Sequence, residues 1–167
     1  MERAARKGHY PYYGATSVMG YVDDYLFDGD YILLGEDGSV QDDQGYPILQ
    51  RVYEKFWVNN HAHILQGVQP VNNNYLIQVL KNTKVGHIVT GAVQPKISQG
   101  NLNSLEIILP EREIIIEFQN RINETFDLLK SNNSEIEVLS KLRDLLLPKL
   151  ISGEIIPSHL QTIEQAL

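Results

Sequence analysis

Two histidines, His61 and His63, are the residues of this 167-residue sequence whose type and spacing come nearest to catalytic chemistry. On a β-strand, residues two positions apart point to the same side, so the two imidazoles could bind one metal ion. A carboxylate four or five residues further on would complete such a site, but the nearest downstream acidic residue is Glu106. We therefore favour two histidines on a polar strand face, with a metal-dependent enzyme as the less favoured alternative.

The common catalytic motifs are absent from the sequence. It contains no G-x-x-x-x-G-K-[ST] phosphate loop, no G-x-G-x-x-G dinucleotide motif and no G-x-S-x-G nucleophile motif. The adenine-methylating motif of methyltransferases, an Asn or Asp followed by two prolines and an aromatic residue, is also missing. There is no cysteine, which excludes disulfides, thiolate nucleophiles and cysteine-bound zinc. The sequence predicts a protein that is not an enzyme and has no metal or cofactor of its own.

Three polar segments, residues 14–17, 59–63 and 90–101, carry amide, hydroxyl and imidazole groups but no carboxylates. Such groups can hydrogen-bond to the edges of DNA bases, and lysines suit phosphates. The same residue types fill turns in any β-rich protein, so only the set as a whole indicates DNA binding. The candidate DNA-contacting residues are Tyr13, Thr16, Ser17, Asn60, His61, Lys84, Thr90, Gln94 and Lys96.

The net charge of −7 argues against DNA binding, because neutralisation of phosphates supplies most of the affinity for DNA. The charges are unevenly distributed, however. Residues 23–54 contain nine acidic residues and one arginine, whereas residues 55–105 contain four lysines and no acidic residue. A β-rich region with few charges explains the second stretch equally well, so the pattern permits DNA binding without establishing it.

The predicted secondary structure that must position these residues changes at Pro110, from short strands before it to a long helix after it. Aromatic and β-branched residues between glycines predict short strands up to residue 67, with a buried strand in 28–38 and a pair of strands in 46–67. Residues 71–83 predict a short helix with Asn72 to Asn74 available as its cap, and residues 86–110 predict loops and strands. The expected fold class is α+β, a compact β-rich domain followed by a long C-terminal helix.

Residues 111–147 contain neither glycine nor proline, and their apolar residues recur at heptad spacing. These residues form one continuous helix or, with a break near residues 130–135, two stacked helices. In either case the apolar seam is too long to be covered by its own domain and needs a partner helix. Pro148 predicts the end of the helix, with Gly153 as a further break. The predicted partner-facing residues are Phe118, Ile122, Leu129, Asn132, Ile136, Leu139 and Leu146.

The predicted boundaries are therefore 1–110 for the β-rich domain, 111–148 for the helix and 149–167 for a C-terminal tail. The N-terminus has no apolar core typical of a signal peptide, and no apolar run approaches the roughly 20 residues of a membrane span. We expect a soluble protein in the cytoplasm that does not contact a membrane.

Several segments of the sequence together resemble a known family. The segments YPYYGATSVMGYVDDYLFDGDYILLGEDGSV, FWVNNHAHIL, TGAVQPKISQGNLNSLEIILP and LRDLLLPKLISGEI resemble the target recognition domain and conserved helix of a Type I restriction–modification specificity subunit. VTGAVQPKI and LLPKLISGEI are the most specific of these, and they occur in the family's order. The resemblance extends from about His9 to Ile155.

The resemblance implies a non-catalytic protein of a restriction defence system that reads a short half-site in double-stranded DNA. A partner modification subunit would methylate adenine in DNA with S-adenosylmethionine, and a separate restriction motor subunit would use ATP and Mg. The long helices of the family pair as an antiparallel coiled coil that separates two recognition domains. The region around LLPKLISGEI would then lie at a docking edge for a second recognition unit or for the methyltransferase.

The sequence departs from the family pattern in two ways. It has one recognition domain and one long helix where a full-length member has two of each, and few residues precede the first matching segment. We expect a half-subunit, a truncated product or an excised fragment. A functional half would form a homodimer through the long helix and read a palindromic, interrupted target. An oligomerisation or adaptor protein without DNA readout is the main alternative.

Overall fold

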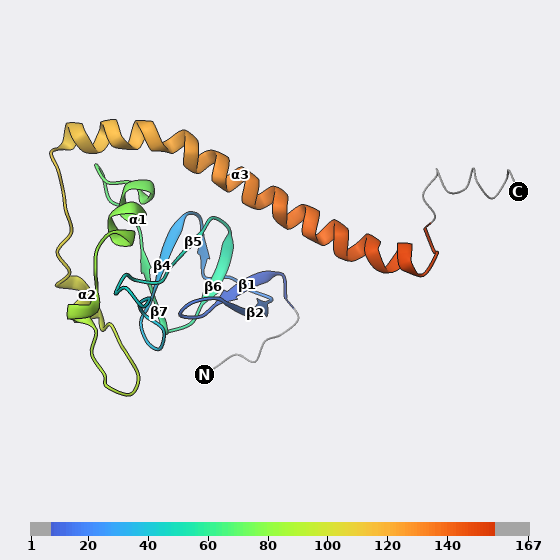
Figure 1. The fold of residues 1–167 in the computed structure, drawn as a ribbon, viewed down its shortest axis with the longest axis horizontal. Helices are drawn as coiled ribbons and strands as arrows, with labels where there is room; N and C mark the ends of the chain where they lie inside the picture. Colours follow the sequence, from blue (N-terminus) through green and yellow to red (C-terminus); the bar gives the residue numbers. More distant parts are fainter. Residues whose placement is uncertain (1–7, 156–167) are drawn as a thin grey trace, which may run out of the picture. The chain divides into compact units, whose positions relative to one another are not determined.

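The computed structural model describes residues 8–155, and the chain divides into two units between Ile122 and Asn123. The first unit contains short strands, short helices and the first turns of a long helix, which continues through the second unit (Figure 1). The strands are β1 (Tyr10–Tyr13), β2 (Val18–Val22), β3 (Phe27–Asp28), β4 (Tyr31–Gly35), β5 (Leu49–Val52), β6 (Lys55–Val58) and β7 (Ala62–Leu65). The helices are α1 (Asn73–Lys81), the 3-10 turn η1 (Gly86–Ile88), α2 (Gln99–Asn103) and α3 (Arg112–Ile151).

The strands of the first unit form two sheets. One has the order β2-β1-β6-β3, and the other has the order β5-β4-β7. The pairs are antiparallel except for β1 with β6, where Tyr12 is paired with Trp57 and Tyr13 with Val58 in a parallel register. The predicted α+β fold class is confirmed. The region expected to hold a pair of strands holds three, because Tyr53 and Glu54 separate β5 from β6.

Strand β4 lies between two hydrophobic clusters, and its side chains are buried on both faces. Ile32, Leu33 and Leu34 are fully buried. Because successive side chains of a strand point to opposite faces, Leu33 packs in one cluster with Phe56, and Leu34 packs in the other with Ile97. The buried strand predicted from the short apolar run between two turn signals is confirmed.

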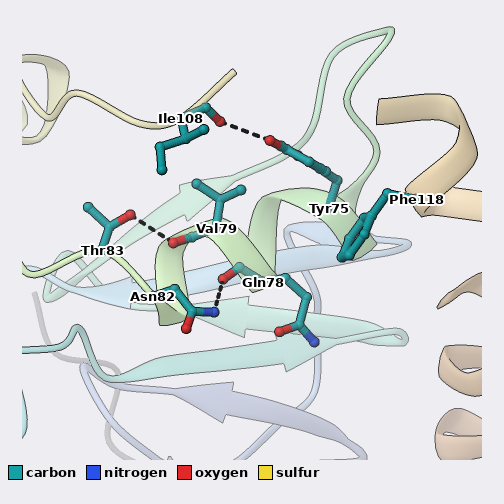
Figure 2. A pocket seen from close by; sticks show the side chains of 7 residues that line it. All are labelled: Tyr75, Gln78, Val79, Asn82, Thr83, Ile108 and Phe118. Atoms are coloured by element: carbon teal, nitrogen blue, oxygen red, sulfur yellow. Dashed lines mark hydrogen bonds between the residues drawn. The ribbon is translucent and has the colours of Figure 1, made fainter. Parts of the chain in front are cut away.

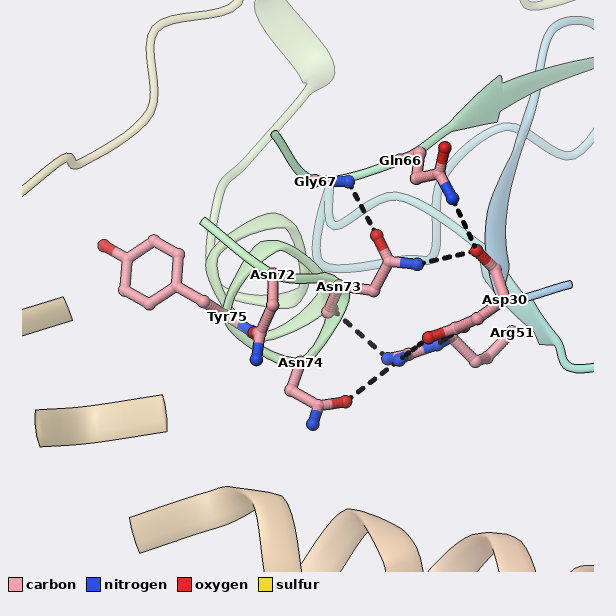
Figure 3. Close-up of polar contacts among 8 residues, drawn as sticks. All are labelled: Asp30, Arg51, Gln66, Gly67, Asn72, Asn73, Asn74 and Tyr75. Carbon is pink, nitrogen blue, oxygen red and sulfur yellow. Dashed lines mark hydrogen bonds and ion pairs between the residues drawn. The ribbon is translucent and has the colours of Figure 1, made fainter. Parts of the chain in front are cut away.

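Helix α1 starts where the sequence predicted a cap. The side chain of Asn72 accepts a hydrogen bond from the backbone N–H of Tyr75 at 2.9 Å, which satisfies one of the free donors of the first turn. Asn73 is buried and connects the helix to the strands, since its amide donates to the Asp30 carbonyl and its oxygen accepts from the Gly67 N–H. The three consecutive asparagines therefore act in the scaffold (Figure 3).

Arg51 on β5 holds the same corner together (Figure 3). Its Nε and Nη2 donate to the two carboxylate oxygens of Asp30 at 2.5 and 2.7 Å. Nη1 also donates to the backbone carbonyl of Asn73, and Nη2 to the side chain of Asn74. The Arg51 side chain is only 10% exposed, so its charge is compensated by this two-pronged ion pair and not by water.

The first turns of α3 belong to the first unit. Ile115 and Gln119 are buried there. The Gln119 amide accepts from the Asn72 N–H at 2.7 Å and donates to the Pro70 carbonyl at 3.0 Å, which fixes the segment before α1. Phe118, predicted to face a partner helix, lies edge-on to Tyr75 at a ring-centroid distance of 5.8 Å and is 37% exposed (Figure 2).

Helix α3 is continuous through residues 130–135, so the alternative of two stacked helices is wrong. The prediction that Pro148 ends the helix is also wrong, because the helix runs to Ile151. Proline has a helical φ, and its missing N–H bond and the clash of its ring with the preceding turn cost about 3 kcal/mol, which a long helix can bear. The Pro148 carbonyl still accepts from the Ser152 N–H at 2.9 Å. Gly153, with φ +74°, stops the helix by taking the left-handed conformation that favours glycine. The predicted tail therefore begins inside α3, and residues 156–167 of it lie outside the described residues.

The region of residues 86–110 differs from the prediction of loops and strands. Its only regular elements are η1 and α2, and strand-like pairing there is confined to isolated bridges of Lys96 with Asp37 and with Thr90. Helix α2 forms because the Ser98 hydroxyl accepts from the Asn101 N–H, a cap that outweighs the weak helix propensity of the residues that follow. None of the helices within residues 8–155 has the length and apolar character needed to cross a membrane.

Replacing Arg51 with methionine should lower the free energy of unfolding by about 2–4 kcal/mol, because Asp30 and the acceptors of Asn73 and Asn74 lose their donor. Urea denaturation followed by the fluorescence of Trp57 measures this. The matched control is Arg121→Met, which breaks an exposed ion pair with Glu117 and should cost less than about 0.5 kcal/mol. Equal losses in the two variants would contradict a structural role for the Arg51 pair.

Candidate nucleic-acid interface

Four chain segments meet where β4 ends, and we name them together the loop junction: residues 14–17, 36–38, 59–61 and 90–96. The Glu36 N–H donates to the His61 carbonyl at 2.8 Å, and the Gly38 N–H donates to the Pro95 carbonyl at 2.9 Å. The backbone of residues 14–17 lies close by, since a Cβ added to Gly35 would be 3.1 Å from the carbonyl oxygen of Ala15. Three of the four segments fall within the polar segments identified in the sequence, residues 14–17, 59–63 and 90–101.

Two carboxylates form ion pairs with the two basic side chains of the loop junction. The Lys96 ammonium is 3.0 Å from a Glu36 oxygen, and the His61 Nδ1 is 2.8 Å from a carboxylate oxygen of Asp37. Glu36 and Asp37 were absent from the predicted site, and they would have been hard to find because their partners lie at least 24 residues away in sequence. Their position directly after the buried run YILLG was the available signal, since polar residues at the end of a buried strand lie at its rim.

Residues 90–96 form a closed loop with an exposed tip. Thr90 and Lys96 exchange backbone hydrogen bonds of 2.8 and 2.7 Å at its base. Gly91 has a φ of +89°, and a Cβ there would lie 2.2 Å from the Gln94 carbonyl oxygen, so only glycine fits. At the tip, Val93 is fully exposed and Gln94 is exposed. An exposed apolar side chain beside a free amide suits contact with another molecule more than packing.

The structure places most of the predicted DNA-contacting residues in the loop junction. Thr16, Ser17 and Asn60 are exposed on it. Two predicted residues lie elsewhere. Tyr13 is half-buried and packs edge-on against Phe56 at 5.7 Å, in one of the two hydrophobic clusters. Lys84 lies over the ring of Tyr46 at 5.8 Å, beside the turn of residues 42–46.

The prediction that the two histidines share a polar strand face is wrong, and they do not form a paired metal site. His63 is buried, and its Nε2 is 2.7 Å from the Ile97 carbonyl oxygen, whereas His61 is bound to Asp37. Within residues 8–155, no three histidine, aspartate or glutamate side chains are grouped so that they could hold a metal ion. The geometry gives the metal-dependent alternative no support.

Residues 55–105 contain no acidic residue, but in the folded chain carboxylates from elsewhere lie beside two of their lysines. Residues 23–54 provide the carboxylates: Glu36 forms an ion pair with Lys96, and Asp28 lies 3.8 Å from the Lys55 ammonium. The hydrogen bond that the Lys55 ammonium donates to the Tyr25 hydroxyl oxygen and the negative charge that this phenol can carry raise the pKa of Lys55, so this side chain stays cationic. The charge separation seen along the sequence is therefore partly cancelled by folding.

A hollow lies beside α1, with a volume of about 230 Å³. It is bounded by the ring of Phe118, by Tyr75, whose hydroxyl donates to the Ile108 carbonyl at 2.9 Å, and by Val79 (Figure 2). Burial raises the pKa of Tyr75. Among the described residues no Asp, Glu, Lys, Arg or His lines the hollow, so the Tyr75 phenol is its one titratable side chain.

Comparison with known proteins gives a consistent result. The sequence matches the family model of the type I restriction modification DNA specificity domain over residues 2–138. A Haemophilus influenzae protein described as a type I restriction enzyme specificity subunit is 33% identical over 77% of this chain and 32% of its own length. The specificity subunit of the Escherichia coli EcoprrI enzyme is 25% identical over 81% of this chain and 32% of its own length. The chain thus spans about a third of the length of these curated relatives.

A Gly91→Ala substitution should open the loop of residues 90–96, because it adds a clash with the Gln94 carbonyl to the backbone cost of about 1–2 kcal/mol. Hydrogen exchange should show at least about tenfold less protection of the Thr90 and Lys96 amides. Gly45→Ala is the control, since Gly45 has a φ of +88° but no atom within 4 Å of an added Cβ. Unchanged protection in Gly91→Ala would show that the loop accommodates a side chain.

Proposed function

Because the chain belongs to the family of type I restriction modification DNA specificity domains, we propose that it recognises a DNA sequence through the loop junction. In this proposal the chain has no catalytic role. It directs a partner adenine methyltransferase and a restriction motor to the target. The observation that carries the proposal is the convergence of four polar segments at the end of one buried strand, with exposed amide, hydroxyl and imidazole groups.

The side chains of the loop junction divide by the part of DNA that they suit. Gln94 and Asn60 can pair with the edge of adenine, and Thr16 and Ser17 can hydrogen-bond to any base. Lys96 suits phosphates, and so does Lys84, which lies outside the loop junction beside Tyr46. The chain is acidic, so a partner subunit would supply many phosphate contacts, and binding by the chain alone should be weak and sensitive to salt.

The second unit supports a proposal about assembly. Leu129, Ile136 and Leu139 of its predicted seam are exposed in the single chain, at 49%, 60% and 53%, whereas Leu146 is half-buried. A seam of this kind is stable when it packs against another helix. We propose that a second copy of this chain supplies that helix, with Asn132 fixing the register. The homodimer would then read a palindromic, interrupted target.

The chemistry of such a complex would lie in the partners. The modification subunit would use S-adenosylmethionine, and the restriction subunit would use ATP and Mg, in the cytoplasm where the DNA is. The exposed helix also favours a second candidate, an oligomerisation or adaptor protein without DNA readout. That candidate predicts no sequence selection by the chain even when the methyltransferase is present.

The DNA proposal predicts that alanine at Gln94, Lys96 and His61 together changes target choice and lowers affinity for the target at least about tenfold, since each good base contact is worth about 1–3 kcal/mol. Methylation of a defined duplex by the chain reconstituted with the modification subunit measures this. The control is alanine at Gln78, Lys141 and His87, which removes the same side-chain types outside the loop junction. Unchanged target choice in the first variant would refute this site.

The assembly proposal predicts that Leu129→Asp with Ile136→Asp makes the chain monomeric, because two seam positions per helix become charged. Losing the burial of each side chain costs about 1.5–3 kcal/mol, which weakens the dimer by at least about a hundredfold. Sedimentation measures the molecular mass. Val138→Asp with Leu145→Asp makes the same change in charge off the seam and should leave the dimer intact. A dimer in both variants would refute the seam.

A further inference from the structure

His61 is held more firmly than an exposed loop residue needs to be. Its backbone N–H donates to the Asn59 side chain at 2.9 Å, and its carbonyl accepts from the Glu36 N–H. Its Nδ1 lies 2.8 Å from the Asp37 carboxylate, whose side chain is only 20% exposed. The main chain and one edge of the ring are therefore fixed, while 41% of the side chain remains exposed.

The partner of Nδ1 determines which ring nitrogen carries the proton. An ionised carboxylate only accepts hydrogen bonds, so Nδ1 must be the donor, and in the neutral ring Nε2 is then a bare acceptor. The other charged groups of the loop junction are Glu36 and Lys96, which are paired with each other. Asp37 is thus the carboxylate that acts on His61, and Nε2 has no hydrogen-bond partner among residues 8–155.

We propose that Asp37 is a positioning residue that keeps His61 in the Nδ1–H form, and that Nε2 of His61 accepts a hydrogen bond from the exocyclic amine of adenine or cytosine. This inference rests on the proposed DNA-binding function. In the major groove adenine and cytosine present an amine donor, whereas guanine presents two acceptors and thymine an acceptor and a methyl group. A bare ring nitrogen therefore selects adenine or cytosine, and the opposite tautomer would not.

His63 provides an internal reference for the tautomer of His61. The Nε2 of His63 lies against the Ile97 carbonyl oxygen, which can only accept, so this ring must carry its proton on Nε2. Two histidines separated by one residue should therefore have opposite tautomers. Long-range proton–nitrogen NMR spectra of the full chain, labelled at histidine and recorded at mildly alkaline pH, distinguish the two forms. The loss of one signal set in His61→Gln assigns His61.

The expected spectrum shows His61 protonated on Nδ1 and His63 on Nε2. In Asp37→Ala the His61 signals should move towards a mixture of the two forms, while those of His63 stay unchanged. Protonation of His61 on Nε2 in the unmodified chain would overturn the proposal, and so would an unaltered His61 in Asp37→Ala. This measurement does not require DNA, so its result is independent of the proposed function.

Selection of bound duplexes from a randomised DNA library at low salt tests the readout. The unmodified chain should select a motif with adenine or cytosine at one position, preferred about tenfold over the other bases. His61→Ala and Asp37→Ala should both lose the preference at that position only. Affinity for random DNA should not fall in Asp37→Ala, because a negative charge is removed, whereas a merely structural role of Asp37 would weaken all binding and lower the melting temperature.

Asp43→Ala is the matched control, because it removes one exposed acidic charge outside the loop junction and should leave the motif unchanged. If His61→Ala and Asp37→Ala both select the same motif as the unmodified chain, the inference about His61 is wrong, but the proposed DNA-binding function is not affected. Failure of the unmodified chain to select any motif, alone and with the modification subunit, would overturn the proposed function and the inference with it.

Discussion

The burial of β4 on both faces is the constraint on which the first unit depends. A strand that is apolar on both sides cannot lie at the surface, so each face must be covered by other elements. The cluster around Leu33 is closed by Phe56 and Val58 of β6, with Tyr13 of β1 and Phe27 of β3 at its edge. The cluster around Leu34 is closed by residues from the 85–102 segment. One strand of five residues thus joins the four-stranded sheet to the later helices and loops.

The position of β4 also determines where the polar segments meet. Glu36 and Asp37 leave the strand directly, and the backbone of Glu36 bonds to His61 on one side and to Ile97 on the other. Loops that would otherwise move independently are therefore fixed to the same rigid strand end. Binding groups held in this way lose less conformational entropy when a ligand arrives, which is the usual advantage of placing loops on a rigid scaffold.

Much of this fold could be predicted from the sequence where the determining interactions are local. The apolar run of β4, the asparagine cap of α1 and the heptad pattern of α3 all depend on neighbours within a few residues. Pro148 was misjudged because its cost in a helix is finite and Gly153, further on, is the effective stop. The loop junction could be predicted only as separate polar segments, because the pairs of Glu36 with Lys96 and of Asp37 with His61 join residues distant in sequence.

In the proposed function, the pairing of charges on folding would limit how this chain binds DNA. Lys96 and Lys55 are already near carboxylates, so nonspecific attraction to phosphates is weaker than the stretch without acidic residues suggested. Affinity that does not come from phosphates must come from base edges or from a partner that grips the backbone. The same carboxylates fix His61 and Lys96 in defined orientations, and that favours selectivity over strength. Weak but selective binding is consistent with the proposed function, in which partner subunits would hold the DNA.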